Sequence, residues 1–164
     1  MEAMWESKAS FSKDRLYRFT LYRRWAELGQ EILFIGLNPS TADEAHNDPT
    51  VRRCINFARD WGYRGIWLGN IFAWRATYPD GLDEVHDPVG RGNNLALKGM
   101  AARCARVVYA WGNQGRLLNR GRQVVDMLGL LGWCFAVNKN GEPRHPLYLP
   151  RNAALTEYYG VNIL

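Results

Sequence analysis

Three asparagine side chains stand where apolar segments of the chain end, and they are the groups best placed to do chemistry. Asn38, Asn70 and Asn113 each follow a short apolar run, at residues 32–35, 65–69 and 107–111. A carboxamide donates and accepts hydrogen bonds at once, and such amides can read the edge of a nucleobase. Because open α/β sheets bind ligands at the carboxyl ends of their strands, the recurrence predicts a site built at strand ends.

The segment after the first run concentrates polar groups just before a predicted helix. Asn38 is followed by Ser40, Thr41 and Asp43, and Asp48 has the position of a helix N-cap. The free backbone amides of a helix N-terminus attract anions, so Ser40 and Thr41 are candidate substrate-binding residues. Asp43 is a candidate general base because it shares this loop with Asn38. The alternative is a turn that Asx and Ser/Thr side chains hold without a ligand, with the aspartates acting as caps.

Arginine and aromatic residues accompany the second amide and the predicted helix. Arg75 follows Asn70 in a stretch that also holds Phe72 and Trp74. Arginine can reach a phosphate and aromatic rings can stack on bases, so this stretch is a candidate nucleic-acid contact. An asparagine that caps its own loop beside core aromatics is the alternative. Arg53 lies in the first turn of the helix, where the dipole disfavours a cation, and a bound anion or a nearby aspartate would offset this.

Two further segments are candidates for the same site. Trp111 and Asn113 lie in a glycine-bounded turn, which lets the backbone approach a ligand closely. His145 lies between Arg144 and Pro146, and the proline keeps it out of helical geometry. A histidine in so stiff a loop can donate a directed hydrogen bond to a substrate, with Arg144 beside it as a binding residue. A histidine that only ties down the loop is the alternative.

Neither a metal nor a cofactor is predicted. The histidines are scattered without the spacing of metal ligands. The chain holds no phosphate-binding P-loop, no G-x-G-x-x-G after a strand and no G-x-S-x-G. The three cysteines are odd in number and far apart, so no disulfide framework is expected, and buried packing positions are predicted for Cys54, Cys104 and Cys134.

Composition and charge limit the class of protein. The 164 residues are 47% apolar without an internal repeat or linker, which predicts one domain over residues 1–164 whose first ten residues are loosely held. The formal charge of +5 comes mostly from arginine, with 17 of the 21 basic residues. Nucleic acid or a nucleotide is therefore an expected partner, although an arginine bias of the host genome would give the same count. Without a membrane-length apolar stretch or an export signal, a cytoplasmic protein with no membrane partner is expected.

The order of predicted elements indicates the fold class. Partial alternation over residues 16–25 suggests an edge strand with one apolar and one basic face. Further strands are expected at 32–35, 65–71, 107–111 and 133–137. Helices are expected at 49–62, at 93–103 with Leu95, Met100 and Ala101 buried, at 116–131, and at 152–159. This alternation predicts a three-layer α/β/α sandwich around a central, mostly parallel sheet.

Several motifs together resemble a family of small, mostly bacterial proteins known as a domain of unknown function. The resemblance covers about residues 16–150. It rests on LNPSTAD at 37–43, DPT at 48–50, RC at 53–54, WGY at 61–63 and HPLYL at 145–149. This resemblance implies no activity, because the family is named for lacking an assigned one.

The order of the motifs is also similar, more distantly, to that of the uracil-DNA glycosylase superfamily. The matches are Gly36-Leu37-Asn38-Pro39 at the first strand end, Asn70 at the second, residues 108–112 at the third and His145-Pro146 in the last loop. The resemblance implies a uracil-DNA glycosylase-like fold in which Asn38 positions water at the sugar carbon, Asn70 reads the base edge and His145 stabilises the departing base anion. Such chemistry needs an extruded base and an electrophile for developing negative charge.

Three departures from that superfamily argue against uracil itself as the substrate. Ser40 stands where the superfamily has a glycine, Leu147 stands where it has a serine after His-Pro, and no aromatic residue occupies the stacking position near Asn47. The leading hypothesis is a glycosylase-like protein that acts on, or binds, a modified or damaged base in nucleic acid. Two alternatives stay open: a non-catalytic binder of nucleic acid or a nucleotide, and a hydrolase or transferase of free nucleosides or nucleotides.

Overall fold

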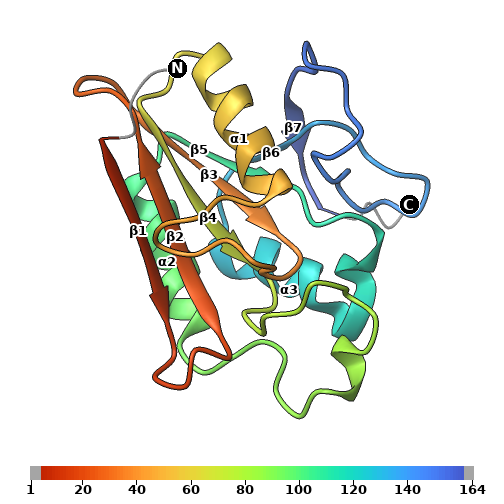
Figure 1. Cartoon of the computed structure of the whole chain (residues 1–164). Helices are drawn as coiled ribbons and strands as arrows, with labels where there is room; N and C mark the ends of the chain where they lie inside the picture. The colour runs from red at the N-terminus through yellow and green to blue at the C-terminus, as the bar shows by residue number, and fades with distance from the viewer. Residues whose placement is uncertain (1–4, 161–164) are drawn as a thin grey trace.

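Seven strands form one sheet, in the order β1-β2-β4-β3-β5-β6-β7 (Figure 1). The computed structural model describes residues 5–160. Its strands are β1 (Glu6–Phe11), β2 (Arg18–Arg24), β3 (Glu31–Gly36), β4 (Gly65–Asn70), β5 (Arg106–Tyr109), β6 (Gly132–Cys134) and β7 (Thr156–Tyr158). Its helices are α1 (Pro49–Asp60), α2 (Asn93–Arg103) and α3 (Arg120–Leu128), with short 3-10 segments η1 (Leu82–Glu84) and η2 (Asn113–Asn119). None of the helices within residues 5–160 has the length and apolar character that a membrane crossing requires.

The sheet is parallel at its centre and antiparallel toward both edges. β3 pairs in parallel with β4 on one side and β5 on the other, and β5 pairs in parallel with β6. β2 adds to β4, β1 to β2 and β7 to β6, each in the antiparallel direction. The expectation of a mostly parallel sheet therefore holds for the four central strands only, because antiparallel strands extend the sheet on both sides.

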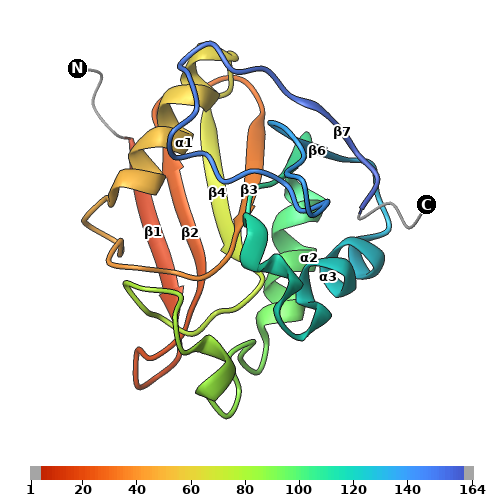
Figure 2. The same ribbon diagram turned by 90° about the vertical axis from the view of Figure 1, so that its right-hand side faces the viewer.

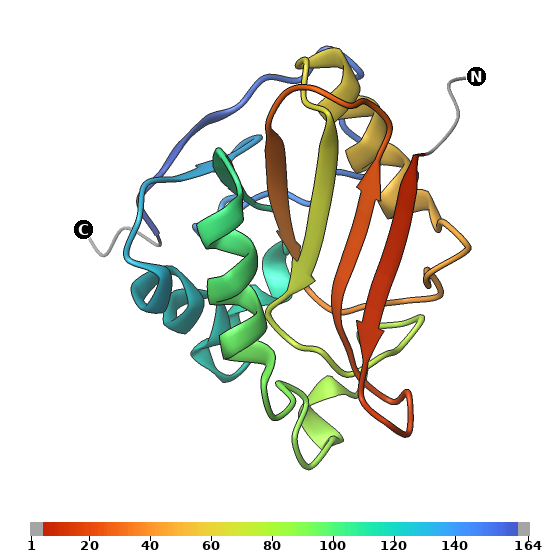
Figure 3. The ribbon, with the colours of Figure 1, turned by 90° about the vertical axis from the view of Figure 1, so that its left-hand side faces the viewer.

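Helices cover both faces of this sheet, as the alternating element order predicts for an α/β fold. α1 lies on one face, whereas α2 and α3 lie on the other (Figures 2 and 3). The buried residues accordingly divide into two clusters, one that includes α1 and one that includes α2 and α3.

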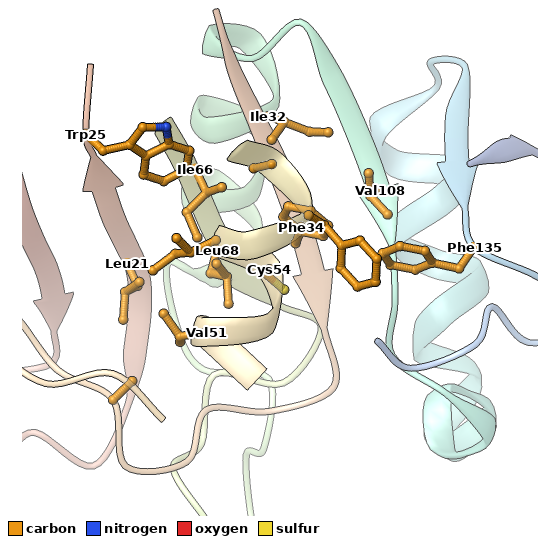
Figure 4. Packing of buried hydrophobic residues seen from close by; sticks show 14 residues of the cluster. Leu21, Trp25, Ile32, Phe34, Val51, Cys54, Ile66, Leu68, Val108 and Phe135 are labelled. Carbon is orange, nitrogen blue, oxygen red and sulfur yellow. The ribbon is translucent and has the colours of Figure 1, made fainter. Parts of the chain in front are cut away.

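β3 shows why helices are needed on both sides. Its side chains alternate, so that Ile32 and Phe34 belong to the cluster with α1, and Leu33 and Ile35 belong to the cluster with α2 and α3. Figure 4 shows the first cluster, in which Phe34 and Phe135 lie side by side near α1. A strand that is apolar on both faces stays in place only between two helical layers, as in parallel sheets generally.

α1 begins at the predicted residue. The Asp48 side chain caps the helix by accepting a hydrogen bond from the Val51 backbone N–H at 2.9 Å, and Pro49 occupies the first helical position. Cys54 and Phe57 are among the residues that the helix buries against the sheet. The packing of α1 thus places its N-terminal turn at the carboxyl edge of the parallel strands.

The outermost strand, β1, corrects two expectations about the start of the chain. Residues 6–10 are not loosely held, because they pair with β2 from Glu6 opposite Arg24 to Ser10 opposite Thr20; residues 1–4 of that predicted loose segment lie outside the described residues. β2 is therefore an inner strand and not an edge strand. Its Arg18 is 2% exposed and does not face solvent.

The end of the chain and two helices also differ from expectation. Residues 152–159 do not form a helix, because 156–158 pair with β6 as strand β7. α3 is shorter than the predicted 116–131, since Leu118 and Asn119 have left-handed φ angles of 53° and 55° that interrupt the helical path. In α2, Leu95 is 76% exposed and Leu97 is buried in its place. Strand 133–137 is reduced to Gly132–Cys134.

Replacing Phe57 by alanine is expected to lower the free energy of unfolding by about 3–5 kcal/mol, because a buried aromatic side chain is lost and a cavity remains. The Phe57 ring centroid lies 5.4 Å from that of Trp61 and 4.7 Å from that of Phe135. Urea unfolding measures the change. Leu95→Ala is the control, and a change within about 0.5 kcal/mol is expected there because Leu95 is exposed. Equal losses in the two variants would contradict this packing.

Candidate functional site

A cavity of about 590 Å³ opens at the carboxyl edge of the central strands. Residues that follow β3, β4 and β5 form its wall together with the first turn of α1 and the loop between β6 and β7. Polar side chains in this wall include Arg18, Asn38, Asp48, Asn70, His145 and Tyr148. The volume lies within the ~300–1,000 Å³ that is usual for small-molecule sites. The position is also the one where open α/β sheets bind ligands.

Asn38 enters the cavity wall with its amide nitrogen already engaged. Its Nδ2 donates to the carbonyl oxygens of Pro39 at 3.2 Å and Ala76 at 2.8 Å. Ala76 in turn donates its backbone N–H to the Pro39 carbonyl, so the loops after β3 and β4 are tied together. With both amide protons directed at carbonyls, the Oδ1 atom of Asn38 is the polar atom left to accept a hydrogen bond from a ligand or a water molecule.

Asn70 brings an unsatisfied donor to the same cavity. The residue is 5% exposed, and its Nδ2 is buried without a hydrogen-bond partner among residues 5–160. Gly36 on the neighbouring strand makes room for this amide, because a Cβ atom at Gly36 would lie only 3.0 Å from the Asn70 Oδ1. A buried amide donor without a partner costs free energy, and its place in the cavity wall makes the Asn70 Nδ2 a candidate donor to a ligand.

His145 is positioned as a neutral hydrogen-bond donor. Its Nδ1 accepts a hydrogen bond from the backbone N–H of Leu147 at 3.2 Å. Burial lowers the pKa of the imidazole, although the charge of Asp48 acts in the opposite direction. Because Nδ1 is the acceptor of a neutral ring, the proton resides on Nε2, which is free to donate.

The loop that carries His145 is fastened to the end of β5. The Gly112 N–H donates to the carbonyl of Pro143 at 2.8 Å, and the Trp111 indole N–H donates to the Glu142 carboxylate at 2.7 Å. The Trp111 ring packs so closely on Gly115 that a Cβ atom there would clash with it. His145 is therefore held by a rigid strand end and does not depend on a free loop.

Asp48 is the carboxylate of the cavity wall. One of its oxygens caps α1, and the other accepts the Ala42 N–H at 3.4 Å. The predicted general base Asp43 does not line the cavity. Its carboxylate accepts the backbone N–H groups of Ala45 and His46, which lower the pKa of Asp43 to about 2.

A buried arginine of β2 holds the loop between β3 and α1. Arg23 is 1% exposed, and its guanidinium donates five hydrogen bonds. Three of these reach the loop, at the carbonyls of Asp43 and His46 and at the Asn47 side chain. The loop is thus anchored to the sheet between the residues that line the cavity.

The structure brings together five of the residues that the sequence predicts for a site, because Asn38, Ser40, Thr41, Asn70 and His145 all line the cavity. The other predicted residues lie outside its wall, and for them a binding role stays a prediction without support from this geometry. The members of this second group are Asp43, Arg53, Arg75, Trp111, Asn113 and Arg144.

The arginines of this second group have partners within the chain. Arg53 lies over the ring of Phe57 at 5.1 Å, Arg75 lies over the ring of Phe11 at 4.8 Å, and Arg144 donates to Asn138 at 3.0 Å. Asn113 accepts from the Asn138 side chain, and Trp111 is buried behind the cavity wall.

Sequence reasoning missed Arg18 and Tyr148, and for Asp48 it favoured helix capping over a role in the site. Arg18 was hidden because strand alternation places basic residues on the solvent face of an edge strand. Tyr148 is 98% exposed at the cavity mouth and has a left-handed φ of 72°, which is uncommon for a residue with a bulky side chain. A sequence signal was present only for Asp48, whose motif Asp-Pro-Thr is also a cap signal.

The fold and the cavity define an α/β protein with a candidate ligand site at the carboxyl edge of its parallel strands. The chain belongs to the family described as "Protein of unknown function (DUF1643)", which matches residues 18–147. This confirms the predicted resemblance to a domain of unknown function. No curated protein and no solved structure is significantly similar to the chain.

Asp48→Asn is expected to lower the pKa of His145 further, because the carboxylate charge that raises that pKa is removed. An NMR titration of the imidazole measures the shift. The asparagine oxygen retains the cap, but the NH₂ group does not accept the Ala42 N–H, so a smaller loss of stability is expected than in Asp48→Ala, which lowers the free energy of unfolding by about 1 kcal/mol. An unchanged titration of His145 in the asparagine variant would show that Asp48 does not act on the imidazole.

Proposed function

We propose that this protein is a glycosylase-like enzyme that hydrolyses the N-glycosidic bond of a base in nucleic acid. The observation that supports this best is the convergence of Asn38, Asn70 and His145 in one cavity from three distant parts of the chain. Each offers one uncommitted polar atom, namely an acceptor on Asn38, a buried donor on Asn70 and an Nε2–H donor on His145.

The acceptor side of the cavity suits the attacking water. The Oδ1 of Asn38 accepts one hydrogen bond from the water and orients its oxygen toward the sugar carbon C1′. The new bond forms between this oxygen and C1′, while the bond from C1′ to the base nitrogen breaks and leaves its electron pair on the base. Asp48 is the carboxylate of the wall and has lone pairs left to take the proton that the water loses.

The donor side of the cavity suits the departing base. The negative charge that develops on the base spreads to its carbonyl oxygens, where the Asn70 Nδ2–H and the His145 Nε2–H can donate. Fixed donors aimed at developing charge stabilise a transition state more than they stabilise the neutral substrate. A neutral imidazole performs this role by hydrogen bonding, without transferring its proton completely.

The mouth of the cavity suits a strand of nucleic acid. Tyr148 presents an almost fully exposed ring there, and aromatic rings stack on bases without regard to sequence. The formal charge of +5 adds sequence-independent attraction to phosphates. A base must leave its stack to reach Asn70, which is buried at the end of β4.

His145→Ala is expected to reduce base release by at least about 100-fold, because it removes a donor to the developing anion. Base release is measured by mass spectrometry on single- and double-stranded DNA and RNA that carry a panel of modified bases. His86→Ala is the matched control, because His86 is an exposed histidine outside the cavity wall. Unfolding of both variants is compared with that of the parent protein to exclude a loss of fold.

The assay separates the hypotheses. Release by the parent and the His86 variant but not by the His145 variant supports a glycosylase and names its base. Equal release by all three contradicts the assignment of His145. Salt-dependent binding without any release indicates a binding protein, and binding that is indifferent to strand length indicates a protein for free nucleosides or nucleotides.

The pH dependence of base release should reflect the lowered pKa of His145. A pKa below the ordinary value means that the imidazole stays neutral as the pH falls toward about 6.5. Release is therefore expected to stay level from neutral pH down to that value and to decrease only below it, where the ring becomes charged. Single-turnover rates across this range test the expectation. A rate that increases toward acid pH would show that the charged ring is the active form.

A further inference from the structure

Arg18 is a buried cation in the wall of the same cavity whose hydrogen bonding is incomplete. It is the first residue of β2, which runs antiparallel to β4, so it lies at the edge of the sheet where β4 ends. The residue is 2% exposed. Its Nη1 donates to the carbonyl of Ala42 at 3.0 Å, and its Nε is buried without a partner among residues 5–160.

The other two arginines that are almost completely buried among residues 5–160, Arg23 and Arg120, both use Nε in a hydrogen bond to the protein. Arg23, on the same strand, donates five hydrogen bonds to the protein. Arg120 donates through Nε to the Ile71 carbonyl at 2.7 Å and through Nη2 to Asn94 at 2.6 Å. Arg18 makes one such bond and is the member of this group that lines the cavity. Its Nε–H is therefore left unsatisfied among residues 5–160, in contrast to the Nε–H groups of Arg23 and Arg120.

The charge of Arg18 is also unpaired by direct contact. Within the described part of the chain, no carboxylate oxygen comes within the 4.0 Å of an ion pair with Arg18. Asp48 is near enough to raise the pKa of Arg18, but neither of its carboxylate oxygens makes an ion pair with the guanidinium. Burial lowers the pKa of Arg18 to about 10, so the guanidinium is still protonated at neutral pH. A buried cation without a partner is costly, and an anionic ligand group would supply the missing partner.

We propose that Arg18 binds a phosphoryl group of the ligand inside the cavity. This rests on the proposed function, because the phosphate is the anionic group that nucleic acids and nucleotides carry. The planar guanidinium matches phosphate geometry through paired N–H donors. A cavity of about 590 Å³ also exceeds the needs of a base alone and has room for a sugar and a phosphate. The ligand is thus a phosphorylated nucleotide unit, with its base at Asn70 and His145 and its phosphate at Arg18.

Two sources of this phosphate are distinguished by ligand choice. A nucleoside 5′-monophosphate carries a terminal phosphate, whereas a dinucleoside monophosphate carries only the diester of a strand. The panel consists of inorganic phosphate, the common nucleosides, their 5′-monophosphates and the corresponding dinucleoside monophosphates. Binding to the parent protein is measured by calorimetry at fixed ionic strength, because phosphate contacts depend on salt.

The expected result is that one phosphorylated form binds the parent about 10- to 100-fold more tightly than the nucleoside. Arg18→Met removes this difference and leaves nucleoside binding unchanged. Arg103→Met is the control, since it also removes one positive charge but changes an exposed residue outside the cavity. The Arg103→Met variant is expected to keep the preference for the phosphorylated form. If the 5′-monophosphate shows the Arg18-dependent increase in affinity, the ligand carries a terminal phosphate. If the dinucleoside monophosphate shows it, the phosphate is the diester of a strand.

A second measurement keeps the proposal testable where Arg18→Met does not fold. The Nε–H proton of Arg18 is followed by NMR in the parent and identified by its absence in Arg18→Lys. Phosphate or the preferred nucleotide is expected to shift this signal, and the corresponding nucleoside is not. Equal binding of nucleosides and their phosphates, a preference that survives the methionine substitution, or an unshifted Nε–H signal would each overturn the proposal.

These readouts are independent of catalysis. An Arg18-dependent phosphate preference without base release would refute the glycosylase and leave the phosphate site standing. Base release without a phosphate preference would support the glycosylase and refute the phosphate site. The two proposals therefore fail separately.

Discussion

The buried guanidinium of Arg23 is the interaction on which the candidate site depends. The loop over 37–48 crosses the carboxyl edge of the sheet without regular structure, so its inward carbonyl groups need donors from elsewhere. Arg23 supplies three of these hydrogen bonds from strand β2. Breaking such a buried network is strongly destabilising, so the loop behaves as part of the sheet. Asn38 at the start of this loop and Asp48 at its end are consequently held in the wall of the same cavity.

The cavity separates chemical tasks by position. Acceptors and the carboxylate come from the segment between β3 and α1, whereas the donors Asn70 and His145 come from β4 and from the loop fastened to β5. A substrate bond that lies between the acceptors and the donors would be polarised in one direction. Because each group is oriented by a backbone hydrogen bond or by burial, little reorganisation is needed when charge develops. Arg18 adds a permanent positive charge to a wall whose other charged residue is Asp48.

The sequence was sufficient where structure is decided locally. Asp48-Pro49 predicts the start of α1, and apolar runs that end in polar residues predict β3, β4 and their shared edge, which brings Asn38 and Asn70 together. The sequence was insufficient where pairing between distant segments determines the structure. β1 and β7 have weak patterns and form because neighbouring strands offer unpaired backbone groups, and the pairing of β1 makes β2 an inner strand, on which Arg18 is buried. Which of Asp43 and Asp48 lines the cavity likewise depends on the path of a loop, and residue types do not specify that path.

The added strand β1 has a consequence for how the molecule meets other proteins. An open sheet ends in unpaired N–H and C=O groups, which can recruit a strand from another chain. Here the outer strand carries the ion pair of Glu6 with Lys8, and a bulge between Ser10 and Phe11 breaks its regular spacing. Charge and irregularity at that edge oppose intermolecular strand addition. The strand that covers Arg23 therefore also protects the folded chain against edge-to-edge aggregation.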